Sequence, residues 1–467
     1  MKPIVPFLAV SLALAGPARS QPPGGEHPLL AELAGQVSAD RLQATDARLV
    51  GFGTRHTLSD TVSDVRGIGA ARRWVAAQFA ALADACAGCL QVQTPSQTFT
   101  GPRIPTPTAV ADVLAVQRGT TDPDRVVVIS AHIDTLMSNF LDGKSDAPGA
   151  NDDGSGVSAV LEAARLLSAH KFPATIVYAV LSGEEQGLYG GKVLADYVVA
   201  QGWRVEADLN NDIIGNIHGL SGTIDNTHVR VFSEGSRTNE TADQASARHG
   251  AGGELDSPSR NLARFMQGLA DHYLPDLQVK LLYRPDRFRR GGDQLEMLNQ
   301  GFPAVRITEA AENYTRQHQT VRVENGIPYG DVLDGVDFPY LAKVARLNVI
   351  TLAALASAPA PPREVALAGA VTPDTTVKWA PSSDAAAHRV WWRDTTEPQW
   401  RYSRLVGQGG EAKLVGVNID DWFFGVSAVG ADGYESPVAF PGASGTYDRL
   451  PPPAPPPPFI SAPAAGK

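Results

Sequence analysis

The sequence predicts an α/β domain with a mostly parallel, twisted sheet flanked by helices, followed by a small all-β sandwich. From about residue 42 to residue 357, apolar segments of strand length alternate with amphipathic helical segments, as in parallel α/β sheets. After a proline-rich break at 358–363 the helical periodicity stops, and short strand-like segments rich in tryptophan follow. With 467 residues, the chain is too long for one compact core.

Seven segments of the first part have the composition of strands. Some are continuous apolar runs, such as 126–129 and 175–181, which is typical of strands covered on both faces. The expected strands are 109–116, 125–130, 174–181, 206–213, 229–232, 278–282 and 304–308. Between them, segment 154–170 has apolar residues at helical spacing, and a last helix is expected at 336–357.

The N-terminus has the pattern of an export signal. Lys2 precedes an apolar run at 4–15, and small residues at Ala18 and Ser20 match a signal-peptidase site. Twelve apolar residues are too few to cross a bilayer. We therefore expect a signal peptide at 1–20, a secreted or periplasmic mature chain without a membrane partner, and a loosely held stretch at 21–40.

The composition excludes several partners and frameworks. The formal net charge of −10 argues against nucleic acid and anionic membranes, both of which require a basic face. The only two cysteines, Cys86 and Cys89, exclude a four-cysteine zinc site. In an oxidising compartment we expect them to form a local disulfide. The sequence does not indicate an oligomeric state.

The second part, residues 363–446, is expected to be a β-sandwich. It holds Trp379 and four further tryptophans of the chain's seven, and it resembles a fibronectin type III module with Trp379 as the buried aromatic. Exposed aromatics such as Trp391 or Trp400 would suit binding to a polymer or partner, although a packing role is favoured. Residues 447–467 are rich in proline and are expected to form a disordered tail.

Five polar segments carry the candidate chemistry, and four of them directly follow a predicted strand, where α/β sheets form their binding crevices. They are SAHIDT with His132 and Asp134, PGANDDGSG with Asp152 and Asp153, LSGEEQGLYGG with Glu184 and Glu185, LNNDIIGN with Asp212, and ENYTRQHQT with Tyr314 and His318. Singly, each segment has an ordinary structural explanation. Together they supply two histidines, three carboxylates and a spare glutamate, which suits two zinc ions sharing one carboxylate. The carboxylate-rich set also leaves manganese or cobalt open.

In this order the five segments resemble those of the di-zinc exopeptidases, which include bacterial leucyl aminopeptidases and glutamate carboxypeptidase II. The likeness covers roughly residues 45–357 and implies a zinc exopeptidase domain at 21–358. It further implies that Asp152 bridges two Zn²⁺, with His132 and Asp212 completing one site and Glu185 and His318 the other. Glu184 would be the general base, Asp134 the partner of His132, and Tyr314 a candidate oxyanion donor. A cis Asp152–Asp153 peptide is also expected.

The implied activity is an aminopeptidase that cleaves peptide substrates by means of a metal-bridging hydroxide. Other functions stay open: a carboxypeptidase or dipeptidase of the same fold, a glutaminyl cyclase with one zinc, or a non-catalytic binding protein like the transferrin receptor. A carboxypeptidase needs basic residues facing its pocket, and the candidates are Arg289, Arg290, Arg306 and Arg316. The resemblance favours an aminopeptidase, and carboxylates at the site, which would favour a free ammonium, agree with it. The preferred N-terminal residue is not readable from the loops.

Overall fold

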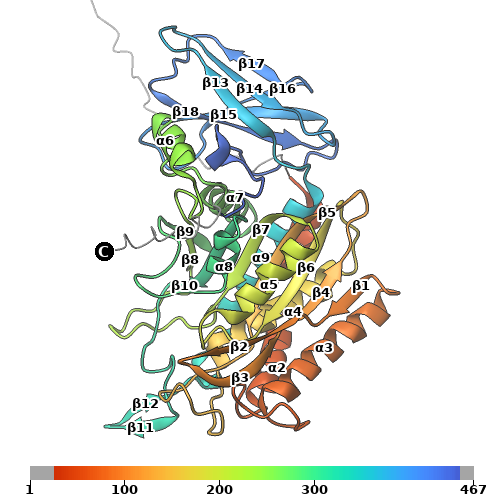
Figure 1. Cartoon of the computed structure of the whole chain (residues 1–467), viewed down its shortest axis with the longest axis vertical. Coiled ribbons are helices and arrows are strands. Elements are labelled where there is room, and N and C mark those ends of the chain that lie inside the picture. The colour runs from red at the N-terminus through yellow and green to blue at the C-terminus, as the bar shows by residue number, and fades with distance from the viewer. Residues whose placement is uncertain (1–25, 453–467) are drawn as a thin grey trace, which may run out of the picture.

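The computed structural model describes residues 26–452, so the expected signal peptide and most of the expected tail lie outside it. A large α/β domain occupies the lower part of Figure 1, and a smaller β domain lies above it. The first domain contains an eight-stranded sheet in the order β1-β4-β6-β5-β7-β10-β8-β9. These strands are Leu90–Gln93 (β1), Val113–Gln117 (β4), Asp122–His132 (β5), Ala174–Leu181 (β6), Arg204–Asn211 (β7), His228–Phe232 (β8), Gln278–Leu282 (β9) and Ala304–Glu309 (β10).

The middle of this sheet is parallel, as predicted. β5 pairs in parallel with β6 and β7, and β7 pairs in parallel with β10. β8 and β9 are parallel to each other, but β8 is antiparallel to β10, and β4 is antiparallel to both β1 and β6. The four central strands therefore all end at the same edge of the sheet, which is the edge that carries the predicted polar segments.

Helices cover both faces of the sheet (Figure 1). Their bounds are Pro28–Gln36 (α1), Ala39–Val50 (α2), Gly67–Ala85 (α3), Gly156–Leu167 (α4), Tyr189–Ala200 (α5), Ala242–Gly250 (α6), Pro258–Tyr273 (α7), Gln294–Asn299 (α8) and Phe338–Ser357 (α9). Alternate residues of β5 point to opposite faces: Ile129 joins the core under α4 and α9, and Val128 joins the core under α5 and α8. This two-sided burial explains the continuous apolar strands.

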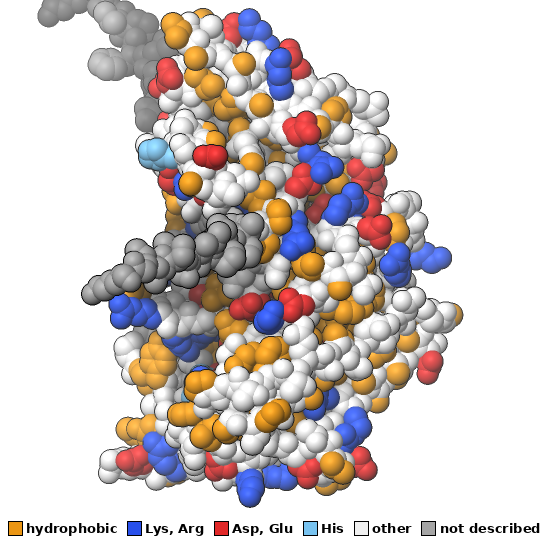
Figure 2. Space-filling model, in the orientation of Figure 1, with side chains coloured by type: hydrophobic (Ala, Val, Ile, Leu, Met, Phe, Trp, Pro, Cys, Tyr) orange, Lys and Arg blue, Asp and Glu red, His pale blue; other side chains and the backbone are white. Residues whose placement is uncertain are grey.

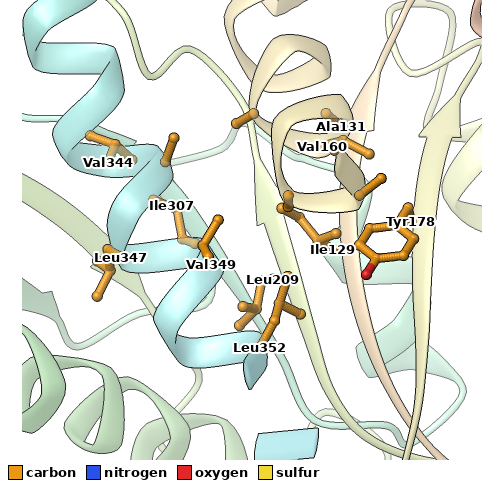
Figure 3. Packing of buried hydrophobic residues seen from close by; sticks show 14 of the residues in the cluster. Ile129, Ala131, Val160, Tyr178, Leu209, Ile307, Val344, Leu347, Val349 and Leu352 are labelled. Atoms are coloured by element: carbon orange, nitrogen blue, oxygen red, sulfur yellow. The ribbon is translucent and has the colours of Figure 1, made fainter. Parts of the chain in front are cut away.

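Helix α9 forms the centre of the larger core. Val349 and Leu352 of α9 face Ile129 and Leu209 of the sheet, and Val160 of α4 packs beside them (Figure 3). By length and composition alone, α9 is apolar enough to cross a membrane, yet 83% of that apolar window is buried inside the protein. Its apolar surface is thus accounted for by packing on the sheet.

Two sequence predictions in this domain are wrong. The expected loose stretch at 21–40 contains α1 and the start of α2, because Leu30 and Leu33 bury fully in the core. The single strand expected at 109–116 is two strands, β3 (Ile104–Ala111) and β4. The buried Asp112 separates them by accepting a hydrogen bond from the backbone of Ser182, and β3 pairs instead with β2 (Ser96–Gly101). The predicted disulfide is confirmed, with 2.07 Å between the sulfurs of Cys86 and Cys89.

The second domain consists of two three-stranded antiparallel sheets that share one core, which confirms the β-sandwich. The sheets are ordered β13-β14-β17 and β16-β15-β18. The strands span Arg363–Ala368 (β13), Thr375–Ala380 (β14), Ala387–Asp394 (β15), Tyr402–Val406 (β16), Glu411–Leu414 (β17) and Trp422–Val429 (β18). Trp379 is buried in this core with Val377 and Phe424, as expected of the central aromatic. The likeness to fibronectin type III remains a prediction.

The sandwich is docked on the α/β domain through buried polar contacts. Asp256 forms ion pairs with Arg393 of the sandwich at 2.7 Å and with Arg264 of α7 at 2.6 Å. The indole of Trp400 donates to Asn261 at 3.0 Å, so this aromatic is a packing residue of the interface. The predicted start of the disordered tail at residue 447 is wrong. Tyr447 is buried, and its hydroxyl donates to the carbonyl of Pro258.

A hairpin of β11 (Arg322–Glu324) and β12 (Ile327–Tyr329) projects at the foot of the domain (Figure 1). Acidic and basic side chains are interspersed over the face shown in Figure 2.

The central strand β7 contains a carboxyl group whose ionisation opposes folding. The side chain of Asp208 is buried and accepts one hydrogen bond from Ser130 at 2.8 Å, while its Oδ2 has no partner. Burial raises the pKa of Asp208 to about 7. Since the unfolded carboxyl ionises near 3.8, the folded protein loses stability as pH rises from about 4 to 7 and no further above that range.

We therefore expect the Asp208→Asn variant to gain stability relative to the wild type as the pH rises from 5 to 8. The gain in the free energy of unfolding should reach up to about 4 kcal/mol. Urea unfolding of both proteins at the two pH values measures this difference. An equal difference at both values would contradict the assignment.

Candidate metal centre

The structure brings all five predicted ligands together at one edge of the sheet. His132 ends β5, Asp212 directly follows β7, and Glu185 lies four residues beyond β6. His318 lies in the loop after β10, and Asp152 in the irregular turn of residues 150–155 that leads into α4. Because β5, β6, β7 and β10 run in the same direction, their carboxyl ends meet at this edge.

The five side chains form two groups that share Asp152. In the first group, His132 Nε2 lies 3.1 Å from Asp152 Oδ1 and 3.9 Å from Asp212 Oδ2. In the second, His318 Nε2 lies 3.0 Å from Asp152 Oδ2 and 2.9 Å from Glu185 Oε1. Within each group the potential ligand atoms all lie within 4.8 Å of one another. The two oxygens of Asp152 thus face different groups, as a bridging carboxylate requires.

These residues fit a pair of zinc ions. Glu185 Oε1 is buried and its near neighbour is His318 Nε2 at 2.9 Å, so a cation held between the two would offset the desolvation of the carboxylate. Each group combines imidazole nitrogen with carboxylate oxygen, the set that catalytic zinc takes, and leaves room for a further ligand. Both cysteines are committed to the disulfide elsewhere in the domain.

Asp134 connects His132 to the glutamate loop. His132 Nδ1 lies 3.0 Å from the backbone oxygen of Asp134 and 3.6 Å from its carboxylate, so the backbone is the nearer partner. The carboxylate accepts hydrogen bonds from the backbone N–H groups of Glu184 and Glu185, each at 3.2 Å, and from Thr57. Although burial alone would raise it, the pKa of Asp134 is lowered by its interaction with His132. Asp134 therefore orients both the histidine and the adjacent glutamates.

The loop around Asp152 is held from several directions. The Asp152–Asp153 peptide is cis, which confirms that prediction. Asp331 accepts the backbone N–H of Asp152 at 2.7 Å and that of Asn151 at 2.9 Å. Asp153 accepts the backbone N–H groups of His132, Gly156 and Ile213, and thereby joins the loops of three ligands.

A buried arginine supports the same loop from beneath. Arg55 is fully buried and donates to the carbonyls of Ile133, Pro148 and Gly149 at 2.7 to 2.8 Å. These three carbonyls belong to the segments that carry His132 and Asp152. The guanidinium therefore fixes the spacing between His132 and Asp152.

Glu184 lies at the rim of the two groups and is partly exposed. Its carboxylate makes no hydrogen bond within the part of the chain that the structure describes, and it is coupled electrostatically to His132, Glu185 and Asp212. Burial raises the pKa of Glu184 well above its usual range, His132 opposes this, and the charge of Glu185 adds to it. An acceptor of this kind suits proton transfer from water.

The ligand Asp212 has a partner that the sequence did not indicate. Arg306 is fully buried in β10 and lies 2.7 Å from Asp212 Oδ1, and its other side faces Asp286 at 3.6 Å. The second oxygen of Asp212 remains turned toward His132. Arg306 therefore positions a ligand, and it is not available to read a substrate carboxylate.

Tyr314 is the one predicted site residue that lies apart. Its side chain is 55% exposed, and Arg290 stacks over its ring at 6.0 Å. Its described contacts do not include a predicted ligand. Its role at the oxyanion remains a prediction.

A cavity of about 10 Å³, room for about one water molecule, adjoins Asp152. Its lining includes two carboxylates, Glu309 and Asp331, the side-chain amide of Asn151, and Arg316. Burial raises the pKa of Asp331 to about 7. The cavity is therefore polar and borders the bridging ligand directly.

Sequence reasoning did not find Asp331, Arg55 or Gln317. Gln317 Nε2 donates to Asp152 Oδ2 at 3.3 Å, and its position beside His318 was the only available signal. Asp331 and Asp152 are 179 residues apart, and no periodic pattern connects them.

The fold and the paired ligand groups define a zinc hydrolase site, and comparison with known proteins agrees. Residues 112–325 match the model of Peptidase family M28. A probable zinc metalloprotease of Pyrenophora tritici-repentis is 41% identical over 427 residues, which is 90% of this chain and 88% of that protein. Another from Leptosphaeria maculans is 42% identical over 412 residues, 87% of this chain and 95% of that protein. The chain therefore belongs to peptidase family M28. It is a zinc metalloprotease, and its substrates are peptides.

Among solved structures, the LapA aminopeptidase of Legionella pneumophila is similar in fold. The TM-score is 0.50 at 20% identity, and the match covers 76% of this chain and 80% of that one. The match to the Pyrenophora tritici-repentis protein extends beyond the α/β domain. Because it covers 90% of this chain and α9 ends at Ser357, it includes residues of the sandwich.

Proposed function

We propose that the protein is an exported aminopeptidase that uses two zinc ions to remove N-terminal residues from peptides. The observation that carries the proposal is the sharing of Asp152 by two groups of three ligands. A glutaminyl cyclase working with one zinc needs only one such group. A non-catalytic relative has no need of either group or of Glu184. Export is supported by the signal-like residues 1–20.

The ligands would be His132, Asp152 and Asp212 for one ion, and Asp152, Glu185 and His318 for the other. When bound, the zinc ions supply Lewis acidity that polarises the attacking water and the scissile carbonyl. Glu184 accepts the proton of the attacking water and then donates it to the leaving amine. Asp134 holds His132 and the glutamate loop in register during both transfers.

The choice of an aminopeptidase is supported by the carboxylates of the site, because Asp152, Glu185 and Asp212 together favour a free ammonium group over a carboxylate. Arg306 is not available for a C-terminal carboxylate, because it is paired with Asp212. The similar structure from Legionella pneumophila is an aminopeptidase, but at 20% identity that likeness concerns the fold.

We expect the purified protein to contain about two zinc ions per chain. Elemental analysis measures the metal, and hydrolysis of Leu-, Ala- and Lys-p-nitroanilides before and after chelation measures the activity. Chelation should abolish release of nitroaniline, and zinc should restore it. Two metals without release would redirect the proposal to a carboxypeptidase or dipeptidase, one metal would favour the cyclase, and no metal would leave a binding protein.

A further inference from the structure

A groove of about 840 Å³ lies between α6 and the sandwich, and Figure 1 shows α6 beside β18. Its lining includes Val365, Leu367, Trp422 and Phe440 of the sandwich and Gln244 and Ala247 of α6. A volume of this size is that of a ligand-binding pocket, and such pockets are often found between domains. Its described lining contains no predicted metal ligand, so the groove is separate from the metal centre.

Both walls of the groove are incompletely packed. Leu367 and Trp422 contact the sandwich core but are only partly buried. Helix α6 has no buried side chain along its nine residues, and Ala247 in the lining is exposed. The start of α6 is fixed by a capping box between Thr241 and Gln244. A short helix depends on tertiary packing for its stability, so α6 would gain from a further apolar segment in the groove.

The polar residues of the groove favour an occupant without acidic side chains. Arg248 of the lining is already paired with two glutamates, at 3.0 and 3.3 Å. Asp243 and Asp420, which also belong to the lining, are exposed. Ser444 is 7% exposed, and its hydroxyl has no hydrogen-bond partner within the described part of the chain. A neutral or basic chain that offers carbonyl acceptors therefore suits this surface.

The last described residues lie beside both walls of this groove. Asp448 pairs at 2.8 Å with Arg363, the first residue of β13, and residues 365–367 of that strand line the groove. The carbonyl of Leu450 accepts a hydrogen bond from Asn239, three residues before the start of α6. The chain therefore continues from a point that is tied to both walls.

Residues 453–467, which lie outside the described residues, have a composition that suits the groove. They are mostly proline and alanine, with Phe459 and Ile460 as large apolar residues and Lys467 as the charged one. Extended polyproline segments lose little entropy on binding and are recognised by aromatic-lined grooves. From Pro452 to Phe459 such a segment spans about 22 Å, which is longer than α6 at about 14 Å.

We propose that residues 453–467 bind in the groove between α6 and the sandwich, with Phe459 and Ile460 in its apolar part. The segment contacts both walls and thereby strengthens the docking of the sandwich on the α/β domain. Its proline carbonyls are acceptors for the free hydroxyl of Ser444. This inference goes beyond the proposed function, because neither the metal ions nor the peptidase reaction takes part in it.

Binding of the separate segment tests the proposal. A fluorescent peptide with the sequence 453–467 is titrated with the full chain and with a chain shortened to end at Pro452, which keeps every described residue. In the full chain the attached segment competes at an effective concentration of about 1 mM. We therefore expect the shortened chain to bind the peptide about tenfold or more tightly, as measured by fluorescence anisotropy. A peptide with Phe459→Asp should bind about tenfold more weakly.

Two substitutions on α6 locate the binding site. In the shortened chain, Ala247→Arg should abolish peptide binding, because the larger side chain fills the groove. Ser246→Arg is the matched control, since Ser246 is exposed on the same helix and does not belong to the lining. The melting temperature of each variant shows whether it is folded. The peptide should raise the melting temperature of the shortened chain but not that of the full chain.

The outcomes that overturn the proposal are equal binding by the full and shortened chains, no binding by either, or unchanged binding by Ala247→Arg. Light scattering tests a different occupant. Self-association of the shortened chain beyond that of the full chain, without peptide binding, would assign the groove to a second copy and would also overturn the proposal. Because no measurement uses peptidase activity, a failure here is distinct from a failure of the proposed function.

Discussion

Replacing Glu184 by glutamine should lower kcat by about 10³-fold and leave the metal content unchanged. The amide is of equal size, but it accepts no proton from the attacking water. Glu184 belongs to neither ligand group, so the ions should remain bound. Elemental analysis and steady-state kinetics of the variant measure the two expectations.

Glu32→Gln is a suitable control, because Glu32 is exposed on α1 and contacts only Gln36 among the described residues. Its kinetics should equal those of the wild type. Turnover of Glu184→Gln near the wild-type rate would show that another group accepts the proton.

Replacing Asp152 by asparagine should remove both ions, because both ligand groups depend on this residue. We expect less than about one zinc per chain and a loss of activity of about 10³-fold or more. The neutral amide also cannot offset two cations. Metal content after dialysis and residual peptidase activity are the measurements.

Two single-group variants make the comparison sharper. Asp212→Asn affects only the group of His132, and Glu185→Gln only the group of His318, so each should retain about one zinc. If Asp152→Asn retained as much metal as these variants, the bridging role would be wrong.

The central strands and the chemistry of the ligands were predictable because their signals are local. Strand β6 begins and ends where the apolar run predicted, since a strand buried on both faces must be apolar along its length. His132 and Asp212 were identified because they come at the carboxyl ends of such strands, where a parallel sheet forms its crevice. The wrong prediction of a single strand at 109–116 has the same origin. The residues on both sides of Asp112 have the composition of a strand, and the hydrogen bond from Ser182 to Asp112, which separates β3 from β4, leaves no local signal.

The supports of the site were not predictable in this way. Arg306 is a surface residue by composition, but the register of β10 on β7 buries it against Asp212. Trp400 has the composition of an exposed binding aromatic, yet docking of the sandwich on α7 makes it an interface residue. A buried ion pair or interface depends on which segments meet, and a single chain carries no periodic signal for that choice.

By itself, the sequence determined the α/β class, the sandwich after residue 363 and the set of five candidate ligands. The first two follow from residue spacing, and the candidate ligands follow from the chemistry of their side chains together with the resemblance to the di-zinc exopeptidases. Only the tertiary structure decided that Asp331 and Arg55 hold the Asp152 loop, and that Arg306 pairs with Asp212. Those arrangements join residues far apart in the chain, and they arise from packing, where burial makes each polar group find a partner.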